Sequence, residues 1–412
     1  MNDKNSIYTL APPRGRPSNA TEIVDYIIHS ALRFEASDIH LAVNHHNQVP
    51  EPYLIRFRIN GKLKLVRSDF IGPYYREVVA RLKVLAGMST TEVFVAQDGQ
   101  LAINTQLGTI VLRISTIPSQ DADDVCIRVQ RKYKKKTFTL DKLNMTPNML
   151  DTLKRVITQK SGMVILNGPA GSGKTTTIYT VLSTLASPEK KTVTAEDPIE
   201  MRLPYVNHTQ ITPKTDFAAL CRAFMRQDAD VIFVGEIRDP DSAAAAVQLA
   251  QTGHLVVTTL HTRDSVGVIS RLEALDVHPN FIATSLLASL GQRLVVKLCP
   301  SCRQEFRPSE KILTEMNKIL PIPKTVAFSK PGPGCNQCSA GLAGRTPVFE
   351  LFVIDGEISE LINKGSTRLQ VLDVARRKGM RTFAEDALQR VYSGQVDFES
   401  IQHMIFMPSY SQ

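Results

Sequence analysis

Residues 168–175 read Gly168-Pro169-Ala170-Gly171-Ser172-Gly173-Lys174-Thr175, directly after the apolar residues 163–166. The stretch matches GxxxxGK[ST], in which glycines let backbone N–H groups turn towards phosphate oxygens at a helix N-terminus. Residues 176–186, which begin with Thr176, have a helical pattern, so the strand, loop and helix follow in the expected order. Lys174 would reach the β- and γ-phosphates, and Thr175 would offer its hydroxyl to Mg²⁺. The stretch therefore predicts a site for ATP and Mg²⁺.

The chain around this motif alternates strand and helix signals from about residue 140 onwards. Short β-branched runs without polar alternation occur at four places, residues 164–167, 192–195, 231–234 and 255–259. Such strands are typically buried on both faces, as in a parallel sheet covered by helices. We expect an α/β nucleotide-binding domain over residues 141–412.

Two of these strands are followed by carboxylates. Residues 231–234 precede Gly235-Glu236, a Walker B-like strand end with glycine at the usual aspartate position, and residues 192–195 precede Glu196-Asp197. The carboxyl ends of parallel strands face the ligand crevice, where a carboxylate can orient or deprotonate water. We favour Glu196 as general base and Glu236 as partner of Mg²⁺-bound water, but the residues leave this choice open.

Histidines bracket another predicted strand. His254 precedes residues 255–259, and His261 follows them at the carboxyl end. A single histidine is more often structural, but a pair flanking one strand beside a P-loop favours a function. His261 is therefore a candidate sensor of the γ-phosphate or a coupling residue between sites.

Four of the six cysteines form two CxxC pairs. Such pairs suit a tetrahedral zinc site with thiolates at about 2.3 Å from the metal, and four ligands leave no open position for catalysis. The sequence predicts one structural Zn²⁺ in a subdomain over residues 297–345. Its ligands would be Cys299, Cys302, Cys335 and Cys338.

The N-terminal third has a different texture. Residues 1–20 contain three prolines and read as a flexible tail. Residues 21–131 combine helical and strand patterns, with Asn60-Gly61 between two strand-like runs as a strong hairpin signal. We expect a smaller α+β domain there, joined to the α/β nucleotide-binding domain by a basic linker at residues 132–140.

Composition limits the remaining possibilities. The 412 residues carry a net charge of +9, a modest excess, and 6% aromatics without tryptophan. Sparse aromatics argue against direct nucleic-acid binding, because single strands are usually held by stacking. The N-terminus lacks a signal peptide, and no run approaches the roughly 18 apolar residues of a membrane span. We therefore expect a cytoplasmic protein.

The motifs in this order resemble the ATPase family of type II secretion and type IV pilus systems over about residues 20–405. Glu196-Asp197-Pro198-Ile199-Glu200 resembles the aspartate box of that family, and Gly235-Glu236-Ile237-Arg238-Asp239 resembles its atypical Walker B motif, glycine included. Further matching stretches are Ala36-Ser37-Asp38-Ile39-His40, Arg56-Phe57-Arg58-Ile59-Asn60-Gly61, Gln97-Asp98-Gly99, Arg113-Ile114-Ser115, Thr252-Gly253-His254, His261-Thr262, Gly344-Arg345-Thr346-Pro347-Val348-Phe349-Glu350 and Gly379-Met380.

The resemblance implies a RecA-like motor domain, a PAS-like N-terminal domain, a helical C-terminal region at residues 346–412 and a homo-oligomer, usually a hexamer. It also implies that arginines of the N-terminal domain reach the nucleotide, a role that falls to Arg113 and Arg128. The implied location is the cytoplasmic face of an inner membrane, beside a platform protein of the pilus or secretion machine.

The chain departs from the family pattern in two ways. Its short N-terminus is typical of retraction motors, whereas its four cysteines are typical of assembly motors, and Arg263 stands where asparagine is common. The resemblance implies a motor for pilus assembly or type II-like secretion. The alternatives are a conjugative-transfer or pilus-retraction ATPase and a RecA-like nucleic-acid motor.

Overall fold

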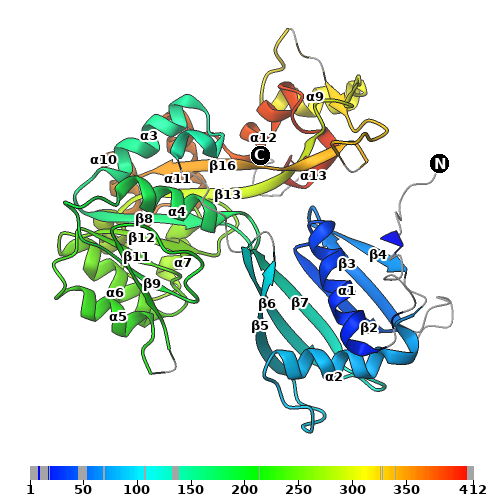
Figure 1. Cartoon of the computed structure of the whole chain (residues 1–412). Coiled ribbons are helices and arrows are strands. Elements are labelled where there is room, and N and C mark those ends of the chain that lie inside the picture. The colour runs from blue at the N-terminus through cyan, green and yellow to red at the C-terminus, as the bar shows by residue number, and fades with distance from the viewer. Residues whose placement is uncertain are drawn as a thin grey trace. The chain divides into compact units, whose positions relative to one another are not determined.

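The structure is a computed structural model that describes residues 8–9, 17, 19–44, 53–67, 70–105, 108–131, 139–212, 214–324, 326, 328–338 and 340–405. The chain divides into two compact units, Met1–Lys136 and Thr137–Gln412, and each is described by itself. Figure 1 labels their elements. Most of the expected tail at residues 1–20, and residues 132–138 of the expected linker, lie outside the described residues. In the described part of the chain, no helix is both long and apolar enough to cross a membrane.

The first unit is a seven-stranded sheet in the order β1-β4-β3-β2-β7-β6-β5, with helices α1 (Ala20–Arg33) and α2 (Tyr75–Leu85) and the short helix η1 (Gly72–Tyr74). All neighbouring strands are antiparallel except β1 and β4. The strands are β1 (Tyr8–Thr9), β2 (Asp38–Val43), β3 (Tyr53–Ile59), β4 (Lys62–Arg67), β5 (Gln97–Thr105), β6 (Gly108–Ile117) and β7 (Asp124–Arg131).

Alternation places the apolar residues of these strands on one face, where they form one core with the buried faces of α1 and α2. The predicted hairpin is confirmed, because β3 and β4 pair antiparallel around Asn60 and Gly61. Both turn residues have positive φ, 50° and 83°, which suits the right-handed twist of the flanking strands.

The second unit is a seven-stranded mixed sheet in the order β10-β9-β11-β12-β8-β13-β16. Only the pair β13 and β16 is antiparallel. Every residue of β8, β9, β11 and β12 is buried, which confirms the prediction from their unalternating sequence. The strands are β8 (Gly162–Asn167), β9 (Thr192–Glu196), β10 (Val206–Gln210), β11 (Val231–Val234), β12 (Leu255–Leu260), β13 (Leu286–Leu298) and β16 (Leu342–Val353).

Helices cover both faces of this sheet (Figure 1). One apolar core joins the sheet to η2, α3 and α4, and the other joins it to α5, α6, α7, α8, α10 and α11, which pack on the opposite face. The helices as far as β13 are η2 (Leu140–Leu143), α3 (Pro147–Ile157), α4 (Lys174–Leu185), α5 (Phe217–Phe224), α6 (Pro240–Gln251), α7 (Val268–Glu273) and α8 (Pro279–Ser285).

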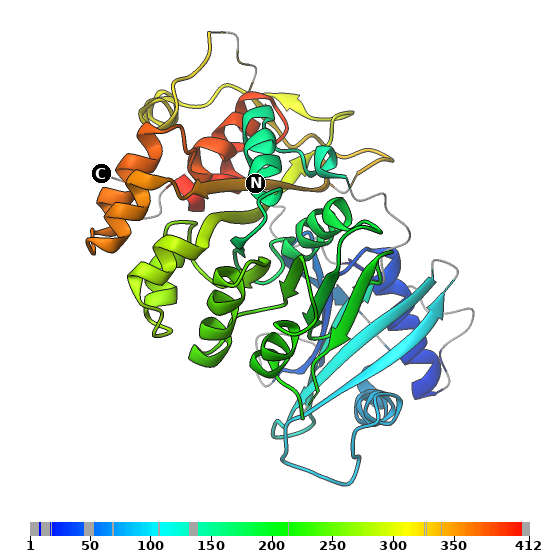
Figure 2. The same cartoon turned by 90° about the vertical axis from the view of Figure 1, so that its left-hand side faces the viewer.

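The long strands β13 and β16 extend beyond their parallel neighbours, and the segment with the four cysteines is inserted between them. The insertion holds β14 (Gln304–Glu305), α9 (Glu310–Ile319) and β15 (Ser329–Lys330). The described residues after β16 are mainly helical (Figure 2). Helix α12 packs on β16, and α13 packs on β13. These last helices are α10 (Gly356–Asn363), α11 (Arg368–Arg377), α12 (Phe383–Tyr392) and α13 (Phe398–Ile405).

Candidate nucleotide site and tetracysteine cluster

The GxxxxGK[ST] motif forms the loop between the interior strand β8, which lies between β12 and β13, and helix α4, which begins at Lys174. Gly168 and Gly173 have φ values of 144° and 89°, which residues with side chains rarely adopt. A Cβ atom would lie 2.3 Å from the Gln292 carbonyl oxygen at Gly168, and 2.7 Å from Gln292 Nε2 at Gly173. Both glycines are thus required by the close packing of this loop against β13.

Lys174 lies against its own loop. Its Nζ donates to the carbonyl oxygens of Gly168 and Pro169 at 2.6 and 3.2 Å. Burial lowers the pKa of Lys174, and the negative charge of Glu236 partly opposes this effect. The P-loop lysine and the Walker B-like glutamate therefore share one electrostatic environment.

The carboxyl ends of neighbouring parallel strands bring the other predicted residues to the same edge. Strands β9, β11, β12 and β8 are successive neighbours in the sheet. Glu196 is the last residue of β9, Glu236 follows β11, and His261 follows β12. Because all four strands run parallel, these side chains and the P-loop lie at one edge of the sheet.

His261 connects the P-loop to Glu236. Its Nδ1 lies 3.1 Å from the carbonyl oxygen of Gly168, and its Nε2 lies 3.2 Å from Glu236 Oε1. Both partners are acceptors, so an imidazolium can donate to both at once. The series of polar contacts continues beyond Glu236. Its Oε2 accepts from Arg238 Nε at 2.8 Å, and Arg238 Nη1 lies 3.7 Å from Asp197 Oδ2.

Glu196 has different surroundings from Glu236. Its side chain is only 4% exposed, whereas that of Glu236 is 23% exposed. The Glu196 carboxylate accepts from the Tyr179 hydroxyl, from Thr194 Oγ1 at 2.5 Å and from His208 Nδ1 at 2.6 Å. Both of its oxygens thus accept from surrounding protein groups, and His208 among these donors is itself 1% exposed, whereas the two Glu236 oxygens are held by the more exposed side chains of His261 and Arg238. Of the two carboxylates, Glu236 is therefore the more exposed.

Sequence reasoning did not identify Tyr179, His208 or Gln292 as part of this arrangement. Gln292 accepts from Thr177 Oγ1 at 2.7 Å, one helical turn into α4. No spacing signal marks these residues, because Tyr179 on α4, His208 on β10 and Gln292 on β13 meet their partners only through the packing of these elements. Arg238 belongs to the Walker B-like motif at residues 235–239, but no role was predicted for it.

Arg113 and Arg128 lie in the first unit, on the sheet face opposite to the apolar core. They are direct cross-strand partners in β6 and β7. Asp38 is the next partner in the row and binds Arg128 Nε at 3.0 Å, and Arg58 Nε follows at 3.6 Å. Arg113 itself is exposed. The register therefore places three arginines and one carboxylate in a single row across four strands.

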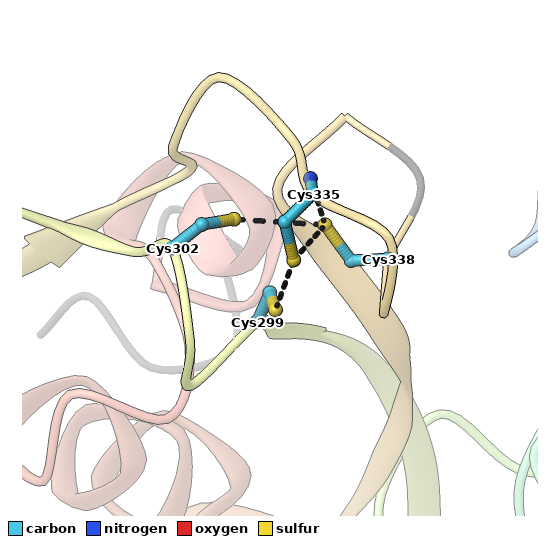
Figure 3. A group of neighbouring side chains, drawn as sticks. All are labelled: Cys299, Cys302, Cys335 and Cys338. Carbon is cyan, nitrogen blue, oxygen red and sulfur yellow. Dashed lines mark hydrogen bonds between the residues drawn. The ribbon is translucent and has the colours of Figure 1, made fainter.

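The two CxxC pairs meet at the base of the insertion between β13 and β16 (Figure 3). The sulfur atoms lie 3.8 Å apart for Cys299 and Cys335, and 3.6 Å apart for Cys302 and Cys338 and for Cys335 and Cys338. All four lie within 4.8 Å of one another. Thiolates at about 2.3 Å from a tetrahedral metal would be about 3.8 Å apart, so the donor set and its spacing fit Zn²⁺.

The P-loop follows strand β8 and packs against β13, and polar side chains from the neighbouring strands lie at the same end of the sheet. This arrangement defines a P-loop NTPase of the α/β class. The chain belongs to the family described as Type II/IV secretion system protein, whose model matches residues 17–403.

Named relatives support this membership. The type II secretion system protein HxcR of Pseudomonas aeruginosa is 36% identical over 388 residues, 92% of this chain and 76% of that protein. The type IV pilus assembly ATPase PilB of Thermus thermophilus is 35% identical over 387 residues, 93% of this chain but only 43% of that protein.

Solved structures show the same fold. The ATPase DotB of Legionella pneumophila has a TM-score of 0.70 at 18% identity, covering 97% of this chain and 99% of that one. The pilus retraction motor PilT with bound ADP has a TM-score of 0.60 at 21% identity, covering 94% and 98%. At these identities the likeness establishes the fold alone.

Proposed function

We propose that this protein is the ATPase motor of a type IV pilus assembly or type II-like secretion machine. The observation that carries the proposal is a complete P-loop between β8 and α4, in a chain that matches the secretion family over residues 17–403. Relatives named as a type II secretion system ATPase and a type IV pilus assembly ATPase match 93% of the chain at 34% and 35% identity. The second unit would be RecA-like and the first PAS-like.

The P-loop would hold the phosphates of ATP through its backbone N–H groups and Lys174, with Thr175 on Mg²⁺. The remaining loop residues Gly168, Pro169, Ala170, Gly171, Ser172, Gly173 and Thr176 would shape this cradle. Glu236 would orient the attacking water and accept its proton, and His261 would link Glu236 to the loop. Glu196 would contribute to ATP hydrolysis from its buried position at the end of β9.

The active assembly would be a homohexamer with Arg113 and Arg128 of the first unit stabilising charge on the transferred phosphoryl group. Arginines are suited to this role because they remain charged and bind phosphate oxygens bidentately. The support is their place in one exposed row beside Asp38, together with the oligomeric nature of the family. The motor would work on the cytoplasmic side of an inner membrane and dock on a membrane platform protein.

The four cysteines would hold a structural Zn²⁺ as thiolates. Zinc supplies four strong bonds that fix the two CxxC turns relative to each other, without an open position for substrate. The support is the mutual spacing of the four sulfur atoms.

The test combines an enzyme assay with a cellular one. Purified protein should hydrolyse ATP in the presence of Mg²⁺, and Lys174→Ala should not. Deletion of the gene should abolish pili or secretion, and a plasmid copy carrying Lys174→Ala should not restore them. If deletion instead leaves pili that form but no longer retract, the chain is a retraction motor, and the assembly proposal is wrong.

A further inference from the structure

The buried carboxylate of Glu196 is held by donors from three elements. Tyr179 belongs to α4, Thr194 to β9 and His208 to the edge strand β10. An ionised carboxylate inside a protein is costly unless it is hydrogen-bonded, and here both oxygens have donors. The arrangement makes Glu196 a fixed acceptor whose orientation depends on its neighbours.

The backbone fixes the tautomer of His208. The N–H of Leu203 donates to His208 Nε2 at 3.0 Å, so this nitrogen carries a lone pair. The proton of the neutral imidazole is then on Nδ1, which lies 2.6 Å from Glu196 Oε1. The His208 side chain is 1% exposed, so water does not compete for these contacts. His208 is thus a directed donor to Glu196.

The same hydrogen-bond network reaches the helix that carries the P-loop lysine. While the Tyr179 hydroxyl donates to Glu196, it accepts from the N–H groups of Glu200 and Met201, each at 3.2 Å. Tyr179 lies in α4, the helix that begins at Lys174. The network therefore ties the nucleotide-binding helix to the end of β9, to residues 200–203 and to β10.

A movement of Glu196 would be passed on to the exposed part of the site. Asp197 is its chain neighbour and lies 3.7 Å from Arg238, which in turn donates to Glu236 at 2.8 Å. We propose that His208 is a positioning residue for ATP hydrolysis, which holds Glu196 and, through Asp197 and Arg238, sets the orientation of Glu236. This inference rests on the proposed ATPase function and adds a residue to it.

The test compares three variants in steady-state ATP hydrolysis, nucleotide binding and thermal unfolding. His208→Ala removes both the donor and the acceptor, and we expect kcat to fall about 10- to 100-fold, as for residues that orient catalytic groups, with nucleotide affinity unchanged. His208→Gln should recover most of kcat, because its amide can donate to Glu196 and accept from Leu203. Asn207→Ala is the matched control, since Asn207 is exposed on the same strand.

Several outcomes would overturn the proposal. A wild-type kcat in His208→Ala excludes a positioning role. If His208→Ala and His208→Gln lose the same fraction of kcat and the same number of degrees in melting temperature, the imidazole only fills space and its hydrogen bonds do not support turnover. If His208→Ala does not fold, the ¹⁵N spectrum of histidine-labelled wild type decides, with His208 assigned by comparison with His208→Gln. Protonated Nδ1 and bare Nε2 support the proposal, and the opposite tautomer contradicts it.

Failure of this inference is distinguishable from failure of the proposed function. If Lys174→Ala is inactive while His208→Ala turns over normally, only the role of His208 is wrong. If the wild-type protein does not hydrolyse ATP, the function itself is wrong.

Discussion

Loss of the metal should open the insertion between β13 and β16 while leaving the main sheet intact. Among the described residues of 299–341, the buried apolar side chains are those of Cys299, Pro308 and Met316, and Met316 packs with partly buried neighbours against the C-terminal helices. The two strands within the insertion have two residues each, and α9 buries only Met316. So small a core does not order such a segment by itself. The cysteines are therefore expected to provide the main constraint.

The expected size follows from the loop that the metal closes. The paired cysteines are 36 residues apart. In the cross-link model, closing a loop of this length lowers the conformational entropy of the open state. This stabilises the closed insertion by about 4 kcal/mol. Replacing Cys335 and Cys338 together by serine should lower the opening free energy of the insertion by about that amount. Amide exchange in α9 should then become about 10³-fold faster, since about 1.4 kcal/mol corresponds to a factor of ten.

Hydrogen exchange read by mass spectrometry measures this directly, with zinc content determined on protein purified without chelator. Amides of the buried strand β8 serve as the internal reference and should keep their protection. Cys126→Ser, which removes a thiol from the other unit, should change neither zinc content nor exchange in α9. Unchanged exchange in the double variant, or a wild type without zinc and with all four thiols freely titratable, would refute the reasoning.

Four other changes test the site and the core. Lys174→Ala should abolish turnover with an unchanged melting temperature, and near-normal hydrolysis would remove the P-loop assignment. Glu236→Gln should lower kcat by about 10²- to 10⁴-fold while nucleotide binding persists, because proton transfer to a positioned base contributes about that much. Arg113→Ala should lower kcat by about 10³-fold. Mixing it with Lys174→Ala subunits should restore part of the activity if the two residues meet between neighbours, and no recovery would argue against a shared site. Asp386→Ala leaves the Arg390 guanidinium in the core without its carboxylate, although its hydrogen bond to the Asn144 carbonyl remains. Because Asp386 is 2% exposed, the free energy of unfolding should fall by about 3–5 kcal/mol in denaturant titration.

The sequence determined the features that depend on short segments. The P-loop is recognisable because eight consecutive residues must satisfy one backbone path, with glycine wherever φ is positive. The two CxxC pairs are recognisable because a metal imposes the spacing of its ligands. The buried strands could be predicted because a parallel sheet under helices leaves no face for polar alternation. The Asn60-Gly61 turn could be predicted because it needs a positive φ at two successive positions, which few residue pairs adopt readily. These local requirements were sufficient for the α/β class and for placing the P-loop, Glu196, Glu236 and His261 at one end of the parallel strands.

Only the tertiary structure decided how the predicted carboxylates differ. Glu196 and Glu236 look alike in the sequence, since each follows a buried strand. The fold brings Tyr179 and His208 onto Glu196 and occupies both of its oxygens, whereas Glu236 remains partly exposed beside His261. Strand order and register create these contacts, and neither follows from the local pattern of either segment. The environment of a carboxylate is set by the residues that packing brings to it, so the sequence could name both glutamates but could not distinguish their surroundings.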